Sequence, residues 1–97
     1  MMNFTLIVCT YMRSQSLLKL LKSIAKQTLY PNEILIIDGS TTHETEMILK
    51  EHIFENLSYF KVEETDRGLT KQRNYGIKKV SQASDIVCFL DDDTNKK

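Results

Sequence analysis

Tryptophan is absent from the sequence, and cysteine, proline and glycine are scarce, with two, one and three residues in a chain of 97. Two cysteines cannot build a disulfide scaffold or a four-ligand zinc site. Cys9 and Cys88 both lie inside apolar runs, so we expect free thiols that pack as small hydrophobic side chains. This usage is typical of a reducing environment and predicts a cytoplasmic protein.

An excess of charge of one sign is also missing, because thirteen Lys and Arg balance thirteen Asp and Glu. Nucleic acid is therefore excluded as a default partner, and affinity for any polyanion would need a local basic patch. No run approaches the roughly 18 apolar residues of a membrane span. The apolar start precedes its positive charge, Arg13, which is the reverse of a secretory signal. We expect no membrane segment in this chain.

The sequence does contain an alternation of strand and helix patterns. Short apolar or β-branched runs predict strands at 4–9, 33–37, 57–62 and 86–90. An amphipathic helix follows Ser14 or Ser16, and a second helix follows Thr41 or Thr42, each a plausible N-cap. A third helix begins near Leu69.

The order β-α-β-α-β-α-β predicts an α/β fold with a Rossmann-like, mostly parallel sheet in one domain or part of one. The third helix is expected to carry Leu69, Arg73, Ile77 and Val80 near one stripe. Ligands of such sheets collect beyond the carboxyl ends of the strands. The residues at those ends are Thr10-Tyr11, Asp38-Gly39-Ser40 and Asp91-Asp92-Asp93.

The triplet Asp91-Asp92-Asp93 carries the clearest chemistry. Three adjacent carboxylates repel one another, and a divalent cation removes that conflict. Mg²⁺ takes one or two carboxylates and completes its shell with water and phosphate oxygens. Acidic turns are common, so the triplet alone is a weak signal, but its place after a buried strand suits a site for a metal-diphosphate.

Two further candidates have a structural alternative beside the functional one. Asp38 could accept from an N–H or a ribose hydroxyl while Gly39 allows a close turn, or it could cap the next helix. Arg73 is a planar donor that matches phosphate, or a member of a structural ion pair. Tyr11 could stack on a base or simply pack.

Taken in order and at these spacings, the motifs resemble the N-terminal, nucleotide-sugar-binding part of family 2 glycosyltransferases with the GT-A fold. The resemblance runs from about Leu6 to Thr94. Its pieces are 8–13 (VCTYMR), 21–28 (LKSIAKQT), 33–40 (EILIIDGS), Gly68-Leu69, 73–77 (RNYGI) and 89–93 (FLDDD).

The resemblance implies roles for the residues that match its motifs. Thr10 and Tyr11 match the loop that borders the nucleobase and ribose. Asp38 matches the acid that contacts the base, and Arg73 matches an arginine near the nucleotide. These four residues are the expected donor-binding positions, together with part of the acidic triplet.

In the triplet, Asp91 and Asp93 match the ends of the family's Asp-x-Asp motif. Asp93 is the best candidate to ligate Mg²⁺ or Mn²⁺, and Asp92 lies close to ribose or metal. The chain departs from the family at Gly39, where a second acid is common, and at Met12, where many members have Asn. We expect that Met12 cannot replace the hydrogen bonds of that Asn.

The implied activity is hexosyl transfer from a nucleoside-diphosphate sugar of the UDP or GDP type to the hydroxyl of an unidentified acceptor, with inversion. The metal would neutralise the departing diphosphate, and a general base would deprotonate the acceptor. In the family that base lies far downstream of the Asp-x-Asp motif. We therefore expect residues 1–97 to be a truncated, partial GT-A domain, the donor half, with little turnover alone. Its fourth strand would be an apolar edge that invites self-association.

Two other interpretations stay open. A haloacid-dehalogenase-type phosphohydrolase also places Asp-x-Asp after an apolar strand, but that motif usually opens the domain and continues to Thr or Val, where this chain has Asn95. A nucleotide-binding fragment without chemistry would keep the sheet and the donor site only.

Overall fold

The computed structural model describes residues 2–91, and it confirms the alternation of strands and helices. The elements are β1 (Phe4–Thr10), α1 (Ser14–Ala25), β2 (Glu33–Asp38), α2 (Glu44–Lys50), β3 (Leu57–Lys61), the 3₁₀ turn η1 (Glu64–Asp66), α3 (Leu69–Lys79) and β4 (Ile86–Asp91). The four strands form one sheet in the order β3-β2-β1-β4, and every neighbouring pair is parallel. The chain therefore has the expected Rossmann-like α/β fold.

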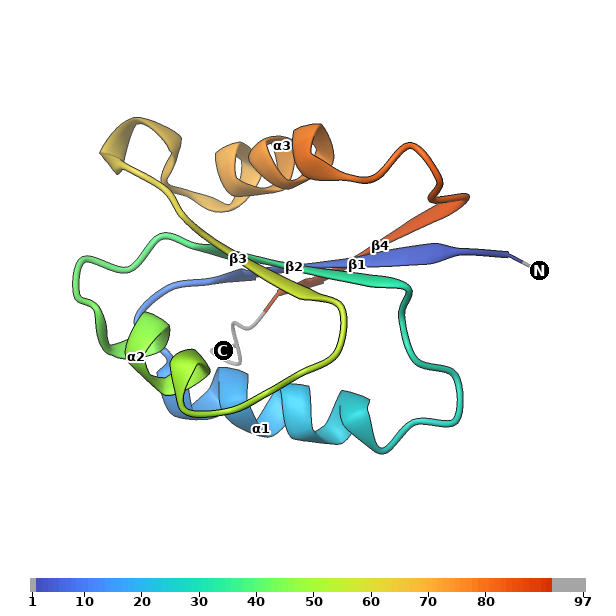
Figure 1. The fold of residues 1–97 in the computed structure, drawn as a ribbon. Coiled ribbons are helices and arrows are strands. Elements are labelled where there is room, and N and C mark those ends of the chain that lie inside the picture. The colour runs from blue at the N-terminus through green and yellow to red at the C-terminus, as the bar shows by residue number, and fades with distance from the viewer. Residues whose placement is uncertain (1, 92–97) are drawn as a thin grey trace.

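The sheet is the middle of three layers, with α1 and α2 on one face and α3 on the other (Figure 1). Alternate residues of a strand point to opposite faces, and so they divide the core in two. On the side of α1 and α2 the buried residues are Leu6, Val8, Leu17, Leu21, Ile24, Ile34, Ile36 and Leu49. On the side of α3 they are Ile7, Cys9, Leu35, Ile37 and Val62.

The predicted N-caps of the first two helices are wrong. Helix α1 begins at Ser14 itself, with Arg13 in the capping position and no capping bond from its side chain. Helix α2 begins at Glu44, after His43. The threonines before α2 do not cap it because His43 holds the capping position, and the Oγ1 atom of Thr41 lies 3.6 Å from the Sδ atom of Met12 in the loop after β1.

The stripe predicted on α3 is not the face that this helix buries. Leu69 and Ile77 are 48% and 51% exposed, whereas Gln72 and Gly76 are buried against the sheet. Gly76 explains the difference, because a Cβ atom there would lie 2.7 Å from the Cγ2 atom of Ile7. Glycine therefore lets the helix backbone come close to β1, and the bulkier apolar residues of α3 lie beside that contact.

Strand β4 is an edge of the described sheet, as expected. Four of its apolar residues, Ile86, Val87, Phe89 and Leu90, are each between 37% and 41% exposed. Both cysteines are free thiols, but only Cys9 is buried; Cys88 is exposed because its strand has no neighbour on the outer side in the described part of the chain. Between residues 2 and 91 no helix is both long and apolar enough to cross a membrane.

Candidate functional site

Three of the predicted site residues lie side by side where the parallel strands end. The register pairs Thr10 of β1 with Asp38 of β2, and it pairs Cys9, one residue earlier, with Asp91 of β4. Because β1 lies between β2 and β4, the backbones of Thr10, Asp38 and Asp91 form one row. This row occupies the position at which open α/β sheets bind their ligands.

The predicted metal site begins at one end of this row. Asp91 is the last described residue, and Asp92 and Asp93 lie outside the described part of the chain. Within that part, no group of three His, Cys, Asp or Glu side chains is placed to hold a metal ion. The metal-binding role of Asp91 and Asp93, and the substrate-binding role of Asp92, therefore stay predictions.

Asp38 is completely buried, and both of its carboxylate oxygens accept hydrogen bonds. Oδ1 accepts from the backbone N–H of Ser40 at 2.9 Å and from the Ser40 hydroxyl, and Oδ2 accepts from the Tyr59 hydroxyl at 2.6 Å. A buried charge is costly unless such donors surround it. The helix-cap alternative for Asp38 is wrong, because its partners lie in its own loop and in β3. A contact between Asp38 and a nucleobase stays a prediction.

Tyr59 is the residue of this cluster that sequence reasoning missed. Burial raises the pKa of its phenol well above the usual value of 10.0, and the hydrogen bond to Asp38 and the charges of Asp38 and Glu46 raise it further. The hydroxyl therefore stays protonated and keeps donating to Asp38. No local sequence signal marks Tyr59, because its partner lies 21 residues earlier in the chain.

The raised pKa of Tyr59 predicts a loss of stability in alkali. The unfolded chain releases the phenolic proton near pH 10 while the folded chain holds it, so the free energy of unfolding falls as the pH rises above about 10. Urea titrations at pH 8, 10 and 11 should show this slope, and Tyr59→Phe should flatten it. An identical slope in the two proteins would contradict the prediction.

The loops after β1 and β2 are tied together through Ser40. Its hydroxyl accepts a hydrogen bond from the backbone N–H of Met12 at 2.7 Å while it donates to Asp38. Met12 itself has φ 53°, in the left-handed region that suits Gly or Asn best. Its Sδ atom accepts from the backbone N–H of Thr41 at 3.4 Å. Met12 therefore makes a weak contact through its sulfur, and the expectation that it cannot replace the hydrogen bonds of an Asn stays a prediction.

Replacing Met12 with asparagine is expected to raise the free energy of unfolding by about 0.5–1 kcal/mol. Asn tolerates the left-handed backbone, and its Oδ1 atom is a stronger acceptor for the Thr41 N–H than a thioether sulfur. Urea unfolding measures the gain. Met12→Leu, which matches Met in size but has no acceptor, is the control and should not be stabilised; equal stability of the Asn and Leu variants would refute the explanation.

Gln72 and Arg67 hold the same loops from the side of α3, and neither role was predicted from the sequence. The Gln72 amide donates to the carbonyls of Ile37 at 2.9 Å and Thr10 at 3.2 Å, and it accepts from the N–H of Gly68 at 3.0 Å. Arg67 Nε donates to the carbonyl of Gly39 at 2.6 Å. Apart from the N–H of Gly68, these partners are backbone atoms far away in sequence, so composition and periodicity could not indicate them.

The remaining candidates lie to either side of the row. Arg73 is half-buried, and its guanidinium carbon lies 5.4 Å from the ring centroid of Phe89 in β4, two residues before Asp91. Tyr11 follows β1 and is 51% exposed. Thr10 is buried, and its carbonyl accepts from the N–H of Gly39 at 3.0 Å. The structure thus joins Thr10 and Asp38 directly, and it places Arg73 next to β4.

Comparisons with known proteins agree with this geometry. The family model described as "Glycosyl transferase family 2" matches residues 5–95. The O-antigen chain rhamnosyltransferase RfbN of Salmonella typhimurium is 30% identical over 92 residues, which are 95% of this chain and 28% of that protein. The poly(ribitol-phosphate) beta-N-acetylglucosaminyltransferase TarS of Staphylococcus aureus is 32% identical over 97 residues, 96% of this chain and 16% of the relative.

A solved structure is similar as well. The crystal structure of S. aureus TarS superposes with a TM-score of 0.77 at 31% sequence identity, and the match covers 95% of this chain and 17% of that chain. The chain thus spans less than a third of the length of each of these relatives.

Proposed function

Because the chain belongs to glycosyl transferase family 2, we propose that it binds the nucleoside-diphosphate sugar of a glycosyltransferase at the carboxyl ends of β1, β2 and β4. The observation that carries the proposal is the register that brings Thr10, Asp38 and Asp91 into one row. Tyr11 directly follows Thr10 and is half exposed, which suits stacking on a nucleobase. Arg73 approaches from α3 as a donor for phosphate oxygens.

The acids at the end of β4 fit a hard divalent cation, because carboxylate oxygens next to a diphosphate are the donors that Mg²⁺ or Mn²⁺ prefers. Asp91 and Asp93 would hold the ion, with Asp92 near the ribose. When bound, the ion would neutralise the charge that builds on the departing diphosphate. The part of the site that the structure describes would bind and orient the nucleotide.

In the whole protein we propose hexosyl transfer to an acceptor hydroxyl with inversion, for which a general base elsewhere must remove the hydroxyl proton. The relatives named above act on different acceptors, so the acceptor is not assigned. Since the chain covers 28% and 16% of these relatives, we propose that residues 1–97 alone bind the donor and turn it over little.

Calorimetric titration with UDP, GDP and their sugars, with Mn²⁺ and then with EDTA, tests the proposal. We expect binding that depends on the metal and that falls at least tenfold in Asp93→Asn. Glu51→Gln, which removes an exposed acid just after α2, is the matched control and should bind as the parent does. Binding that changes neither with EDTA nor in Asp93→Asn would overturn the proposal, and so would hydrolysis of a phosphomonoester.

We also propose that the 97-residue chain self-associates through β4. The outer side of β4 carries backbone N–H and C=O groups that no described strand pairs, with exposed apolar side chains on both faces. A second copy of β4 would satisfy those groups and cover the side chains.

In sedimentation velocity, the apparent mass of the chain should therefore rise with protein concentration. Val87→Lys should suppress this rise. The control is Ile53→Lys, since Ile53 is 99% exposed but lies between α2 and β3, away from the edge. A monomer at all concentrations, or equal suppression of the rise by both variants, would contradict self-association through β4.

A further inference from the structure

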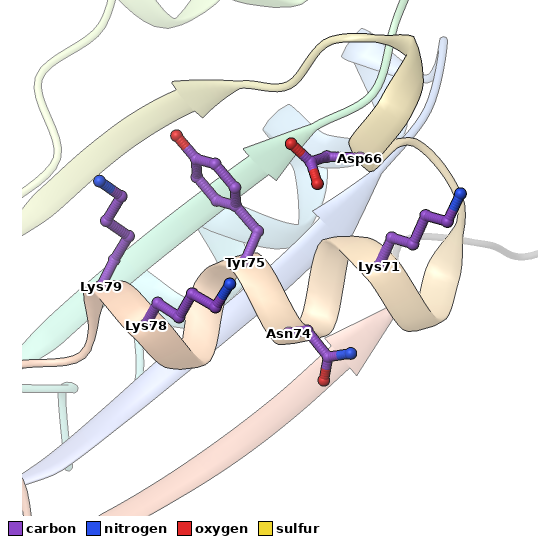
Figure 2. Close-up of a pocket in the computed structure, with 6 residues that line it drawn as sticks. All are labelled: Asp66, Lys71, Asn74, Tyr75, Lys78 and Lys79. Atoms are coloured by element: carbon purple, nitrogen blue, oxygen red, sulfur yellow. The ribbon is translucent and has the colours of Figure 1, made fainter.

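A second surface of the molecule lies on the outer face of α3, separate from the proposed donor site. A hollow of about 390 Å³ is lined by Asp66, Lys71, Asn74, Tyr75, Lys78 and Lys79. Figure 2 shows these side chains on successive turns of α3, with Asp66 reaching in from η1. None of the residues assigned to the donor site lines this hollow.

The charge of α3 sets it apart in a chain that is neutral overall. Its eleven residues, LTKQRNYGIKK, include four cations and no acid. Lys78 and Lys79 lie in the last turn, where the helix dipole favours cations, but Lys71 lies in the first turn, where it does not. Between residues 2 and 91, neither Lys71 nor Lys78 has a carboxylate within ion-pairing distance. Helix stability therefore does not explain Lys71.

The spacing of the donors fits an extended anion. Lys71, Asn74 and Lys78 are at i, i+3 and i+7, so they lie along one side of the helix. At a rise of 1.5 Å per residue, the two lysines are about 10 Å apart along the axis, which is more than one phosphate group spans. At the far end, Lys79 Nζ lies 5.4 Å from the ring centroids of both Phe60 and Tyr75. The lysines therefore form a row that ends next to the rings of Phe60 and Tyr75.

The cations that line the hollow suit phosphate. All three are lysines, which bind phosphate as compact point charges. Asp66 is the one carboxylate of the lining, so the lysines keep an excess of positive charge. A membrane surface is disfavoured, because the site is a hollow and its lining has no aliphatic side chain to insert.

We propose that this groove binds an extended, phosphate-bearing polyanion, with Lys71 and Lys78 as its principal contacts. The site goes beyond the proposed donor site and shares no residue with it. The two proposals can therefore fail separately.

The test uses the 97-residue chain and inorganic polyphosphate of about 15 units, with binding measured by fluorescence anisotropy at several salt concentrations. Three lysine contacts predict that log Kd changes with log salt with a slope of about 2, since each contact contributes roughly 0.7. The double variant Lys71→Gln and Lys78→Gln should weaken binding by about tenfold and lower the slope by about 1.4. Metal-dependent donor binding should be unchanged in this variant.

The matched control is Lys19→Gln with Lys26→Gln, two exposed lysines that are also seven residues apart but lie at α1, on the other face of the sheet. The control should bind polyphosphate as the parent does. Equal weakening by both double variants, or no polyphosphate binding at low salt, would overturn the proposal. So would equally tight binding of orthophosphate, or binding to phosphatidylglycerol vesicles without binding to polyphosphate.

Discussion

Replacing Asp38 with alanine is expected to lower the free energy of unfolding by about 3 kcal/mol or more. The carboxylate is completely buried and accepts from the N–H and hydroxyl of Ser40 and from the hydroxyl of Tyr59. Hydrogen bonds to a charged group contribute about 1.5–3 kcal/mol each, and the truncation leaves three donors without their acceptor.

Urea unfolding followed by circular dichroism measures this effect. Glu51→Ala, an exposed acid beyond α2, is the control and should change stability by less than about 0.5 kcal/mol. If Asp38→Ala lowers the free energy of unfolding by less than about 1 kcal/mol, the hydrogen bonds around Asp38 contribute little to the stability of the fold.

The milder Asp38→Asn variant separates structure from binding. It keeps the shape of the side chain but turns one acceptor into a donor, which then faces the hydroxyl of Tyr59 or the donors of Ser40. If Asp38→Asn, measured where it is still folded, binds nucleotide as the parent does, Asp38 is a positioning residue for the Ser40 loop. If nucleotide binding is lost while the fold is retained, the carboxylate contacts the base.

The second large effect is expected at Gly76. Gly76→Val should lower the free energy of unfolding by about 2–3 kcal/mol, because even a Cβ atom would lie 2.7 Å from Ile7 Cγ2 and 3.3 Å from Ile37 Cγ1. Both neighbours are fully buried β-branched residues of the sheet and have little freedom to move. Helix propensity alone predicts the opposite sign, since glycine is the poorer helix former.

The sign of the change therefore decides between packing and propensity. Thermal and urea unfolding of Gly76→Ala and Gly76→Val should show a graded loss. Thr70→Val is the matched control, because it places a side chain of the same shape at an exposed position of the same helix. A stabilised Gly76→Ala variant would show that α3 can withdraw from β1 at little cost.

The sequence predicted the order and the approximate bounds of the strands because these follow from local runs of apolar residues. The strand predicted at 33–37 is β2, and the third helix begins at Leu69 as expected. The predictions of the helix caps failed because Ser14 is buried in the first turn of α1 and Thr41 contacts the loop after β1. Capping by a residue type competes with such tertiary contacts, which a local pattern does not contain.

For the candidate site, the strand ends were predictable but the contacts between them were not. Thr10, Asp38 and Asp91 are found where strands stop, and a parallel sheet brings strand ends to one side. The pairing of Asp38 with Tyr59, and of the Gln72 amide with the Thr10 carbonyl, spans 21 and 62 residues of sequence. Long-range polar contacts of this kind have no periodicity, so a single sequence does not reveal them.

The central place of β1 has a consequence for synthesis on the ribosome. Of the four described strands β1 is synthesised first, and it pairs on one side with β2 and on the other with β4, so that Phe4 meets its partner Ile86 only later. Translation at roughly 5–20 residues per second separates these two strands by several seconds. During that interval the nascent chain exposes the unpaired side of a strand that is buried in the folded protein, and chaperones that bind extended apolar segments can bind it.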